Sequence, residues 1–261
     1  MARIFITGSS DGLGLLAGRQ LVEEGHEVVL HARNERRAAD TRAALPAAAT
    51  VVIGDLVSLD GMRQVAAQAN AAGPFEAVIH NAAVGYRERR TKTPDRLNHV
   101  FAVNTLAPYV LTALIATPRR LIYLSSGLHR SAHPGLDDLE WEHRPWNGMQ
   151  AYSDSKLHDV ILAFAAARHW PGVFSNALEP GWVPTKMGGP GAPDDLEAGA
   201  ATQVWLAVSE DPAATVSGRY FYHLRARDPN PVARDPAVQD RLIEICASLS
   251  GVAWPEVPRS S

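Results

Sequence analysis

The chain has 261 residues, of which 46% are hydrophobic and 20% charged, a composition typical of a globular protein. Its net charge of -3 argues against a nucleic-acid partner, and its one cysteine, Cys246, excludes an internal disulfide and a cysteine metal cluster. The apolar runs are too short to span a bilayer, so we expect a cytoplasmic protein without a membrane or metal partner.

Strand-like and helix-like segments are predicted to alternate along the chain. The predicted strands are residues 3–7, 27–32, 50–54, 77–80, 120–125, 173–178 and 219–224. The predicted helices include residues 59–72, a long helix from Thr93-Pro94 to about residue 116, and residues 196–208 and 236–250. This order favours one α/β domain over residues 1–261, with about seven strands in a doubly wound parallel sheet and helices on both faces.

A glycine-rich turn follows the first predicted strand. Gly8, Gly12 and Gly14 have the spacing G-x-x-x-G-x-G, with Ser10, Asp11 and Leu13 between them. A turn of this kind before a helix directs backbone N–H groups and the helix dipole towards a phosphate. The simpler interpretation is a turn without function, but its place at the first strand–helix junction favours a dinucleotide site.

The second predicted strand ends without the acidic residue that binds a ribose 2′-hydroxyl. Arg33 stands there instead, and a guanidinium suits a 2′-phosphate. We therefore expect NADP(H) to be preferred, with NAD(H) still possible. Arg36 and Arg37 are interpreted as solvated helix residues.

Small and polar residues follow the next two strands. Asp55 and Leu56 follow the third strand, where the carboxylate can accept from an adenine amino group. Asn81, Ala82 and Ala83 follow the fourth, where small side chains leave room for a ribose and the Asn81 amide can join neighbouring strands.

The fifth strand is bordered by two further signals. Asn104 lies within the long predicted helix, where asparagine is unfavourable, and Pro108 is expected to kink that helix nearby. An exposed Asn104 of no consequence is the alternative. Ser125 and Ser126 stand at the carboxyl end of the strand, the end at which parallel sheets bind ligands.

Tyr152 and Lys156 are four residues apart in a segment with helical apolar spacing, so both should lie on one helix face. The ammonium is expected to lower the tyrosine pKa below its usual value of about 10 and so to suit the phenol to proton transfer. In isolation, such a pair is more often a solvated surface pair.

Two irregular segments, residues 127–149 and 182–196, are predicted to be substrate loops. They carry apolar side chains that favour a medium-sized, largely apolar carbonyl or alcohol substrate: Leu128, Trp141, Trp146, Trp182, Val183 and Met187. The alternative is that the tryptophans fill the core or a subunit contact.

These motifs, taken together and in this order, resemble those of the short-chain dehydrogenase/reductase family. The match extends from residue 3 to about residue 185 and is closest to the retinol-dehydrogenase-like and WW-domain-oxidoreductase-like branch. The resemblance implies a catalytic tetrad of Asn104, Ser126, Tyr152 and Lys156, with Tyr152 and Lys156 also contacting cofactor. It further implies that the turn Pro180-Gly181, with Val183 and Thr185, binds the nicotinamide end.

The chain departs from the family pattern at two places. Ala83 stands where the family has glycine, and the segment between Asn104 and Ser126 is short. The resemblance also implies a possible homo-oligomer through the long Asn104-bearing helix and the tyrosine helix. The outer face of the tyrosine helix would offer Leu162, Ala165, Ala166 and His169.

The predicted function is NADP(H)-dependent oxidoreduction between a carbonyl and an alcohol, with Tyr152 as general acid and base. The alternative is a non-catalytic NADP(H)-binding sensor of the same fold, which would not need Tyr152 and Lys156. A sugar-nucleotide epimerase is disfavoured by the glycine spacing and by the absence of room for a larger substrate domain.

Overall fold

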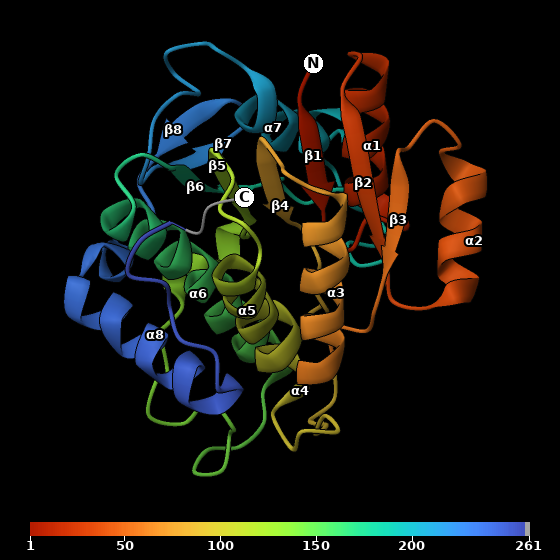
Figure 1. Ribbon diagram of the computed structural model, residues 1–261. Helices are drawn as coiled ribbons and strands as arrows, with labels where there is room; N and C mark the ends of the chain where they lie inside the picture. Colours follow the sequence, from red (N-terminus) through yellow and green to blue (C-terminus); the bar gives the residue numbers. More distant parts are fainter. Residues whose placement is uncertain (259–261) are drawn as a thin grey trace.

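The computed structural model describes residues 1–258 and contains a sheet of eight strands in the order β3-β2-β1-β4-β5-β6-β7-β8 (Figure 1). The first seven strands are parallel and β8 is antiparallel to β7. The strands are β1 (Arg3–Ile6), β2 (Glu27–Ala32), β3 (Thr50–Ile53), β4 (Ala77–His80), β5 (Arg120–Leu124), β6 (Phe174–Glu179), β7 (Tyr220–Tyr222) and β8 (Arg225–Arg227). The predicted doubly wound α/β sheet is confirmed, with one strand more than expected.

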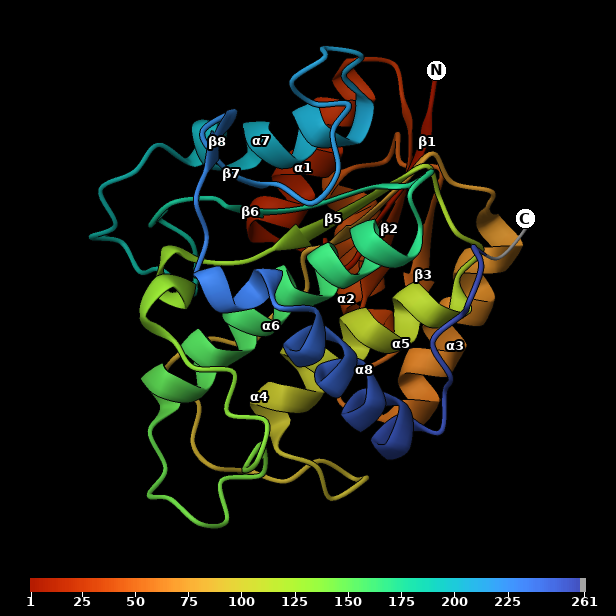
Figure 2. The ribbon, with the colours of Figure 1, turned by 90° about the vertical axis from the view of Figure 1, so that its left-hand side faces the viewer.

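Helices cover both faces of the sheet (Figure 2). One face packs on α1 (Gly12–Glu23), α2 (Glu35–Ala44) and α7 (Leu196–Val208). The other packs on α3 (Leu59–Ala72), α5 (Ala107–Leu114) and α6 (Gly148–His169), with α8 (Pro236–Ser250) packed against α6 and α5. Short elements complete the chain: α4 (His99–Phe101), the π-helical η1 (Ala102–Leu106), and the 3-10 helices η2 (Gly127–Ser131) and η3 (Pro231–Arg234).

The long helix predicted to start at Thr93-Pro94 begins only at His99. The Asn98 side chain caps it by accepting from the N–H groups of Val100 and Phe101. Thr93 instead closes a loop, because its hydroxyl accepts from Leu97 N–H at 3.2 Å. The predicted start is therefore wrong.

Near Pro108, where a kink was predicted, the helix widens into the π-helical η1. Pro108 has no N–H to donate to the carbonyl of Asn104, four residues earlier. One residue before Pro108, the Ala107 N–H donates to the Ala102 carbonyl, five residues earlier in the chain. Asn104 therefore lies within the π-helical segment, a feature frequent at functional sites.

The seventh predicted strand, residues 219–224, is shorter than expected and is followed by a missed strand. His223 and Leu224 have φ of 47° and 63°, and they form the turn between β7 and β8. A two-residue hairpin of this kind usually carries Asn-Gly or Gly-Gly. His-Leu gives no such signal, which is why β8 escaped prediction.

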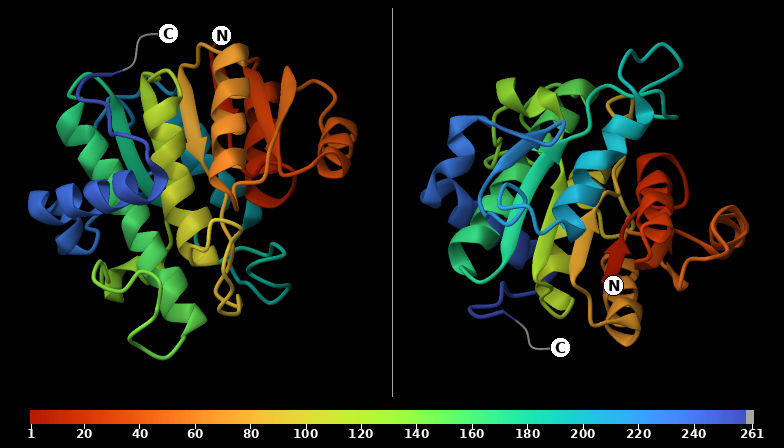
Figure 3. Two further views of the ribbon diagram at one scale, coloured as in Figure 1. Left: turned by 60° about the horizontal axis from the view of Figure 1, so that its bottom comes forward. Right: turned by 90° about the horizontal axis from the view of Figure 1, so that it is seen from above.

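The outer face of α6 is buried within the chain, contrary to expectation. Leu162, Ala165 and Ala166 have no exposed surface. The α8 residues Leu242 and Cys246 belong to the same apolar cluster, and Figures 2 and 3 show α8 alongside α6. The contact surface expected for a partner subunit is therefore closed by the chain's own last helix.

Candidate active site

A cleft of about 750 Å³ lies at the carboxyl ends of the parallel strands, where the irregular segments gather at the lower end of Figure 1. The strand order reverses between β1 and β4, and this switch point is the usual ligand site of such sheets. Fifteen of the predicted site residues line the cleft: Gly8, Ser10, Asp11, Gly12, Leu13, Arg33, Asp55, Leu56, Asn81, Ala82, Ala83, Tyr152, Lys156, Pro180 and Thr185.

The glycine-rich turn fits closely against the end of β4. A Cβ on Gly8, whose φ is 61°, would lie 2.6 Å from Ala82 Cα, and one on Gly14 would lie 2.5 Å from Asn81 Nδ2. The Asn81 amide donates to the carbonyls of Thr7 and Gly8 at 2.9 and 3.0 Å. The predicted role of Asn81 in joining neighbouring strands is confirmed. Gly14 acts in this packing rather than in the cleft wall.

The first turn of α1 faces the cleft without a side-chain cap. Asp11 is the N-cap residue, but its side chain accepts no hydrogen bond from its own helix. Its carboxylate instead pairs with Arg37 at 2.7 Å and Lys186 at 2.6 Å. Although partial burial opposes the effect, these two cations hold the pKa of Asp11 below its usual value. The free N–H groups of α1 and the two cations make a suitable environment for a pyrophosphate.

His31 on β2 supports this turn from behind and was missed from the sequence. Its Nδ1 accepts from Gly8 N–H at 2.9 Å, so its Nε2 carries the proton and donates to the Gly54 carbonyl at 2.8 Å. Burial lowers the pKa of His31, which keeps the ring neutral. Its position in an apolar strand gave no signal of this role.

Two arginines, not one, line the cleft beyond β2. Arg33 lies in the cleft wall, where it was predicted, and its side chain is exposed. Arg37 also lines the cleft, although it was interpreted as a solvated helix residue. The Arg37 guanidinium donates to the Ser10 hydroxyl at 3.0 Å and to the Asp11 carboxylate. That interpretation is wrong, because α2 turns Arg37 back over the glycine-rich turn.

Tyr152 and Lys156 lie buried on one face of α6, and both line the cleft. The Lys156 Nζ is 5.9 Å from the centre of the Tyr152 ring. The same Nζ donates to the Leu124 carbonyl at 2.6 Å and to Asp159 Oδ2 at 2.8 Å. The predicted common helix face is therefore confirmed, and the ammonium is anchored to the end of β5.

The expected low pKa of Tyr152 is not found. Burial raises the pKa of Tyr152 above its usual value and outweighs the opposing effects of Lys156 and Ser126. The Asp159 carboxylate also acts to raise it. The prediction considered the ammonium alone and missed both the burial of the phenol and the counter-ion of Lys156.

Asn104 and Ser126 lie beside the cleft rather than in its wall. The Asn104 side chain binds the main chain of Val84, accepting from its N–H at 2.8 Å and donating to its carbonyl at 3.0 Å. It also donates to Ser155 Oγ on α6 at 3.0 Å. Asn104 is therefore fully buried and joins the segment after β4 to α6, so the exposed alternative is wrong.

The serine pair after β5 divides its work. Ser125 Oγ donates to the Lys156 carbonyl at 2.6 Å and fixes α6 to the strand. Ser126 caps η2 by accepting from Leu128 N–H at 3.3 Å. Its hydroxyl also acts to lower the pKa of Tyr152, against the larger effect of burial.

The segment after β6 lies against the glycine-rich turn, to which the ion pair between Lys186 and Asp11 joins it. Pro180, Thr185 and Met187 line the cleft with Lys186. Gly181 has φ of 84° and lies against Asp194, while Val183 is buried behind the cleft. Gly181 and Val183 therefore shape the segment instead of facing the cleft.

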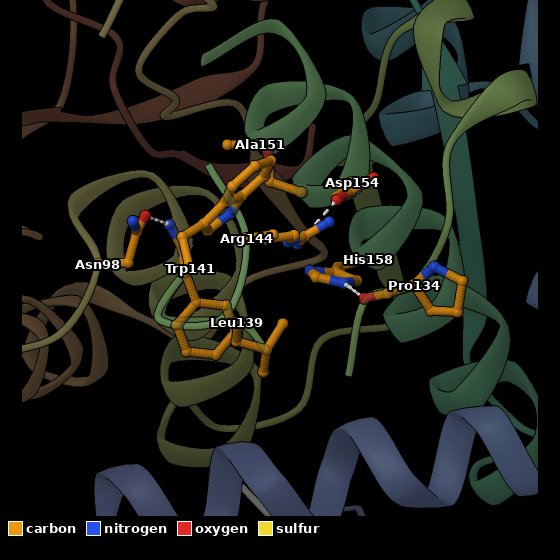
Figure 4. Close-up of a pocket in the computed structure, with 10 residues that line it drawn as sticks. Asn98, Pro134, Leu139, Trp141, Arg144, Ala151, Asp154 and His158 are labelled. Carbon is orange, nitrogen blue, oxygen red and sulfur yellow. Dashed lines mark hydrogen bonds and ion pairs between the residues drawn. The ribbon is translucent and has the colours of Figure 1, made fainter. Parts of the chain in front are cut away.

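Trp141 and Trp146, expected near the substrate, fill the interior of the loop. Their ring centres are 5.1 Å apart, and Trp141 stacks on the Arg144 guanidinium. Figure 4 shows Arg144 directed towards Asp154 in a small cavity of about 10 Å³ on another side of α6. That cavity has the size of one water molecule and is lined by none of Asn104, Ser126, Tyr152 or Lys156.

Comparisons with known proteins agree with this geometry. A family model described as short chain dehydrogenase matches residues 2–122. An oxidoreductase of Emericella nidulans is 43% identical over 98% of this chain and 99% of its own length. The chain belongs to the short-chain dehydrogenase/reductase family. Human retinol dehydrogenase 13 is 32% identical over 97% of this chain and 86% of its own length, so the resemblance predicted from the motifs is confirmed.

Solved structures show the same fold. A protein of Mycobacterium paratuberculosis has a TM-score of 0.82 at 23% identity, covering 98% of this chain and 95% of that one. A short-chain dehydrogenase/reductase of Burkholderia multivorans with bound NADP has a TM-score of 0.66 at 20% identity, covering 88% and 99%. The family membership makes the protein an oxidoreductase. Within residues 1–258, no helix combines the length and the apolar character of a membrane span.

Proposed function

We propose that this protein is an NADP(H)-dependent oxidoreductase that interconverts a carbonyl and an alcohol, with Tyr152 as the general acid and base. The observation that carries the proposal is the buried Tyr152–Lys156 pair, which lines the same cleft as the glycine-rich turn. An NADP(H)-binding sensor needs the turn but not a phenol and an ammonium side by side.

The cleft residues fit the cofactor. Gly12 has φ of 53° and a Cβ there would have only Thr185 Cγ2 nearby, at 3.9 Å, so the backbone is open to a pyrophosphate. Arg37, Lys186 and the uncapped start of α1 supply positive charge around it. Arg33 and the absence of an acid at the end of β2 favour a 2′-phosphate.

The proposed chemistry divides the work among four side chains. When bound, NADPH supplies the hydride. Tyr152 donates its proton to the carbonyl oxygen, and the Ser126 hydroxyl stabilises the charge that develops there. Lys156 opposes the rise that burial causes in the pKa of Tyr152, and it holds the cofactor ribose. Asn104 fixes the segment after β4 and orders a water that passes protons from Lys156 to solvent.

The raised pKa of Tyr152 suits the reaction in the direction of carbonyl reduction. A protonated phenol is the acid that carbonyl reduction needs, and it is the dominant form at neutral pH. Alcohol oxidation needs the phenolate, so its rate should rise towards alkaline pH.

Exposed apolar side chains next to site residues favour an apolar substrate. Leu128 follows Ser126 by two residues, Met149 precedes Tyr152 by three, and Trp182 follows Pro180 by two. All three are exposed, Trp182 by 56% of its surface. Although none of the three lines the cleft itself, their closeness in sequence to site residues supports a medium-sized, largely apolar carbonyl compound as substrate.

The test combines a carbonyl panel with one substitution. NADPH oxidation is followed by absorbance, and we expect cyclic or long-chain ketones to turn over faster than small polar aldoses. Tyr152→Phe removes only the hydroxyl, so kcat should fall by about 10²-fold or more while the protein stays folded. Wild-type turnover in the Tyr152→Phe variant would defeat the proposal. A protein that binds NADPH but reduces nothing would indicate the sensor instead.

A further inference from the structure

A buried carboxylate lies beside the lysine of the proposed site. Asp159 follows Lys156 on α6 by three residues, and its Oδ2 is 2.8 Å from the Lys156 Nζ. The two side chains are 2% and 5% exposed, respectively. An ammonium has three N–H donors. Asp159 and the Leu124 carbonyl take two, which leaves the third for the cleft that Lys156 lines.

Three other titratable groups around this pair, all buried, are neutral at pH 7. They are Tyr152 on α6, Tyr123 on β5 and, behind Tyr123, His80. Burial raises the pKa of Tyr123 and Tyr152 and lowers that of His80 to about 3. Within residues 1–258, Asp159 is the one carboxylate paired with Lys156.

We propose that Asp159 is a positioning residue that holds Lys156 protonated and in place, and thereby sets the upper pH limit of carbonyl reduction. The inference rests on the proposed function for its kinetic part. Its geometric part stands on the ion pair itself: a buried ammonium without a counter-ion is strongly disfavoured, so an adjacent carboxylate is what permits the charge there.

Burial and the ion pair have opposite effects on the pKa values of Lys156 and Asp159. Burial alone lowers the pKa of Lys156, and the Asp159 carboxylate, with a contribution from Tyr152, outweighs burial, so the pKa of Lys156 lies above the ordinary 10.5. Burial raises the pKa of Asp159 to about 6 in spite of Lys156, so Asp159 is a carboxylate at neutral pH. The pair is then charged but carries no net charge.

Removing the carboxylate shortens the pH range in which Lys156 is an ammonium and Tyr152 a phenol. Either Lys156 loses its proton sooner, because burial is no longer opposed, or the uncompensated ammonium draws the proton from Tyr152 sooner. Both routes remove the form that reduces carbonyls at a lower pH. The sign of the effect therefore does not depend on which group titrates first.

The direct test follows the lysine Cε signals by carbon NMR through a pH titration. The chain is suited to this experiment because it has three lysines, Lys92, Lys156 and Lys186. The Lys156 signal is assigned as the one that is missing in the Lys156→Met variant. In the wild type, we expect Lys156 to stay charged beyond the ordinary lysine range. In the Asp159→Asn variant, we expect the Lys156 titration, the alkaline limb of kcat, or both to move down by about one pH unit or more.

A matched control separates charge from structure. Asp154 is also buried on α6, but it pairs with Arg144 at 3.4 Å and with Gln150 at 2.6 Å, as Figure 4 shows for Arg144. Asp154→Asn should leave both the Lys156 titration and the alkaline limb of kcat where they are in the wild type. The two variants remove the same charge from the same helix, so a difference between them reports the contact with Lys156.

Two results would overturn the proposal. One is an Asp159→Asn variant with wild-type Lys156 titration and a kcat lowered equally at all pH values, which indicates a merely structural role. The other is a wild-type Lys156 that titrates below Lys92 and Lys186, a result that decides the matter even if the variant does not fold. A wild type that reduces nothing would defeat the proposed function and leave the NMR result intact.

Discussion

Arg33 and Arg37 both line the cleft beyond β2, but they are held differently. Arg37 is fixed by Ser10 and Asp11, whereas Arg33 is exposed and lies at the position where dinucleotide sites select between cofactors. The first therefore belongs to the turn itself, and the second is available to a 2′-phosphate. This distinction gives the cofactor preference a residue-level test.

Arg33→Ala should weaken NADPH binding by about tenfold or more and leave NADH nearly unchanged, because only NADPH carries the 2′-phosphate. Arg37→Ala should weaken both, since it also releases Ser10 and Asp11. Arg36→Ala is the matched control, because Arg36 is exposed on the same helix and does not line the cleft. The measurement is fluorescence titration of both cofactors, and tighter wild-type binding of NADH than of NADPH would refute the preference.

At the scale of elements, the sequence predicts what its local chemistry specifies. Asp235-Pro236 and Gly251 mark α8 correctly, since Asp235 caps its first turn and Gly251 adopts φ of 66° at its end. Thr93-Pro94 has the same form but closes a loop, because Asn98 competes as the cap closer to the apolar run. Local signals of equal strength are decided by tertiary packing, which the sequence does not display.

The position of α8 bears on assembly. It covers the α6 face that includes Leu162, Ala165 and Ala166, and its Asp240 forms an ion pair with Arg168 at the end of that helix. Because this surface is already buried, we expect no subunit contact through α5 and α6. Light scattering at micromolar concentration should give the monomer mass of 28.2 kDa. A stable dimer would contradict this expectation and would have to use another surface.

At the scale of the whole molecule, the sequence predicts those site residues that belong to contiguous motifs. Gly8, Asn81, Tyr152 and Lys156 stand in recognisable patterns, and the structure brings them to one end of the sheet. His31, Lys186 and Asp159 do not. Their roles come from contacts with Gly8, Asp11 and Lys156, and two of those contacts join distant parts of the chain. Burial decides the electrostatics in the same way, which is why the pKa of Tyr152 was predicted in the wrong direction.

The fold also buries four histidines, His31, His80, His129 and His158, and burial is the first cause that lowers the pKa of each. In the unfolded chain, these rings take up protons below their ordinary pKa of 6.5. Because the folded state resists that proton uptake, the stability they contribute is complete above that pH and is lost as the pH falls below it. Each ring costs at most about 1.4 kcal/mol per pH unit in this range.

Asp159 acts in the opposite direction, because its raised pKa of about 6 lets the folded state take up a proton before the unfolded chain does. One carboxyl group cannot offset four histidines, so the melting temperature should fall steadily between about pH 7 and pH 5, before most carboxylates titrate. His80→Gln should flatten this slope, whereas His143→Gln should not, since His143 is exposed. Thermal unfolding followed by circular dichroism at constant ionic strength measures both, and a melting temperature that stays level or rises on acidification would show that the buried rings do not govern stability.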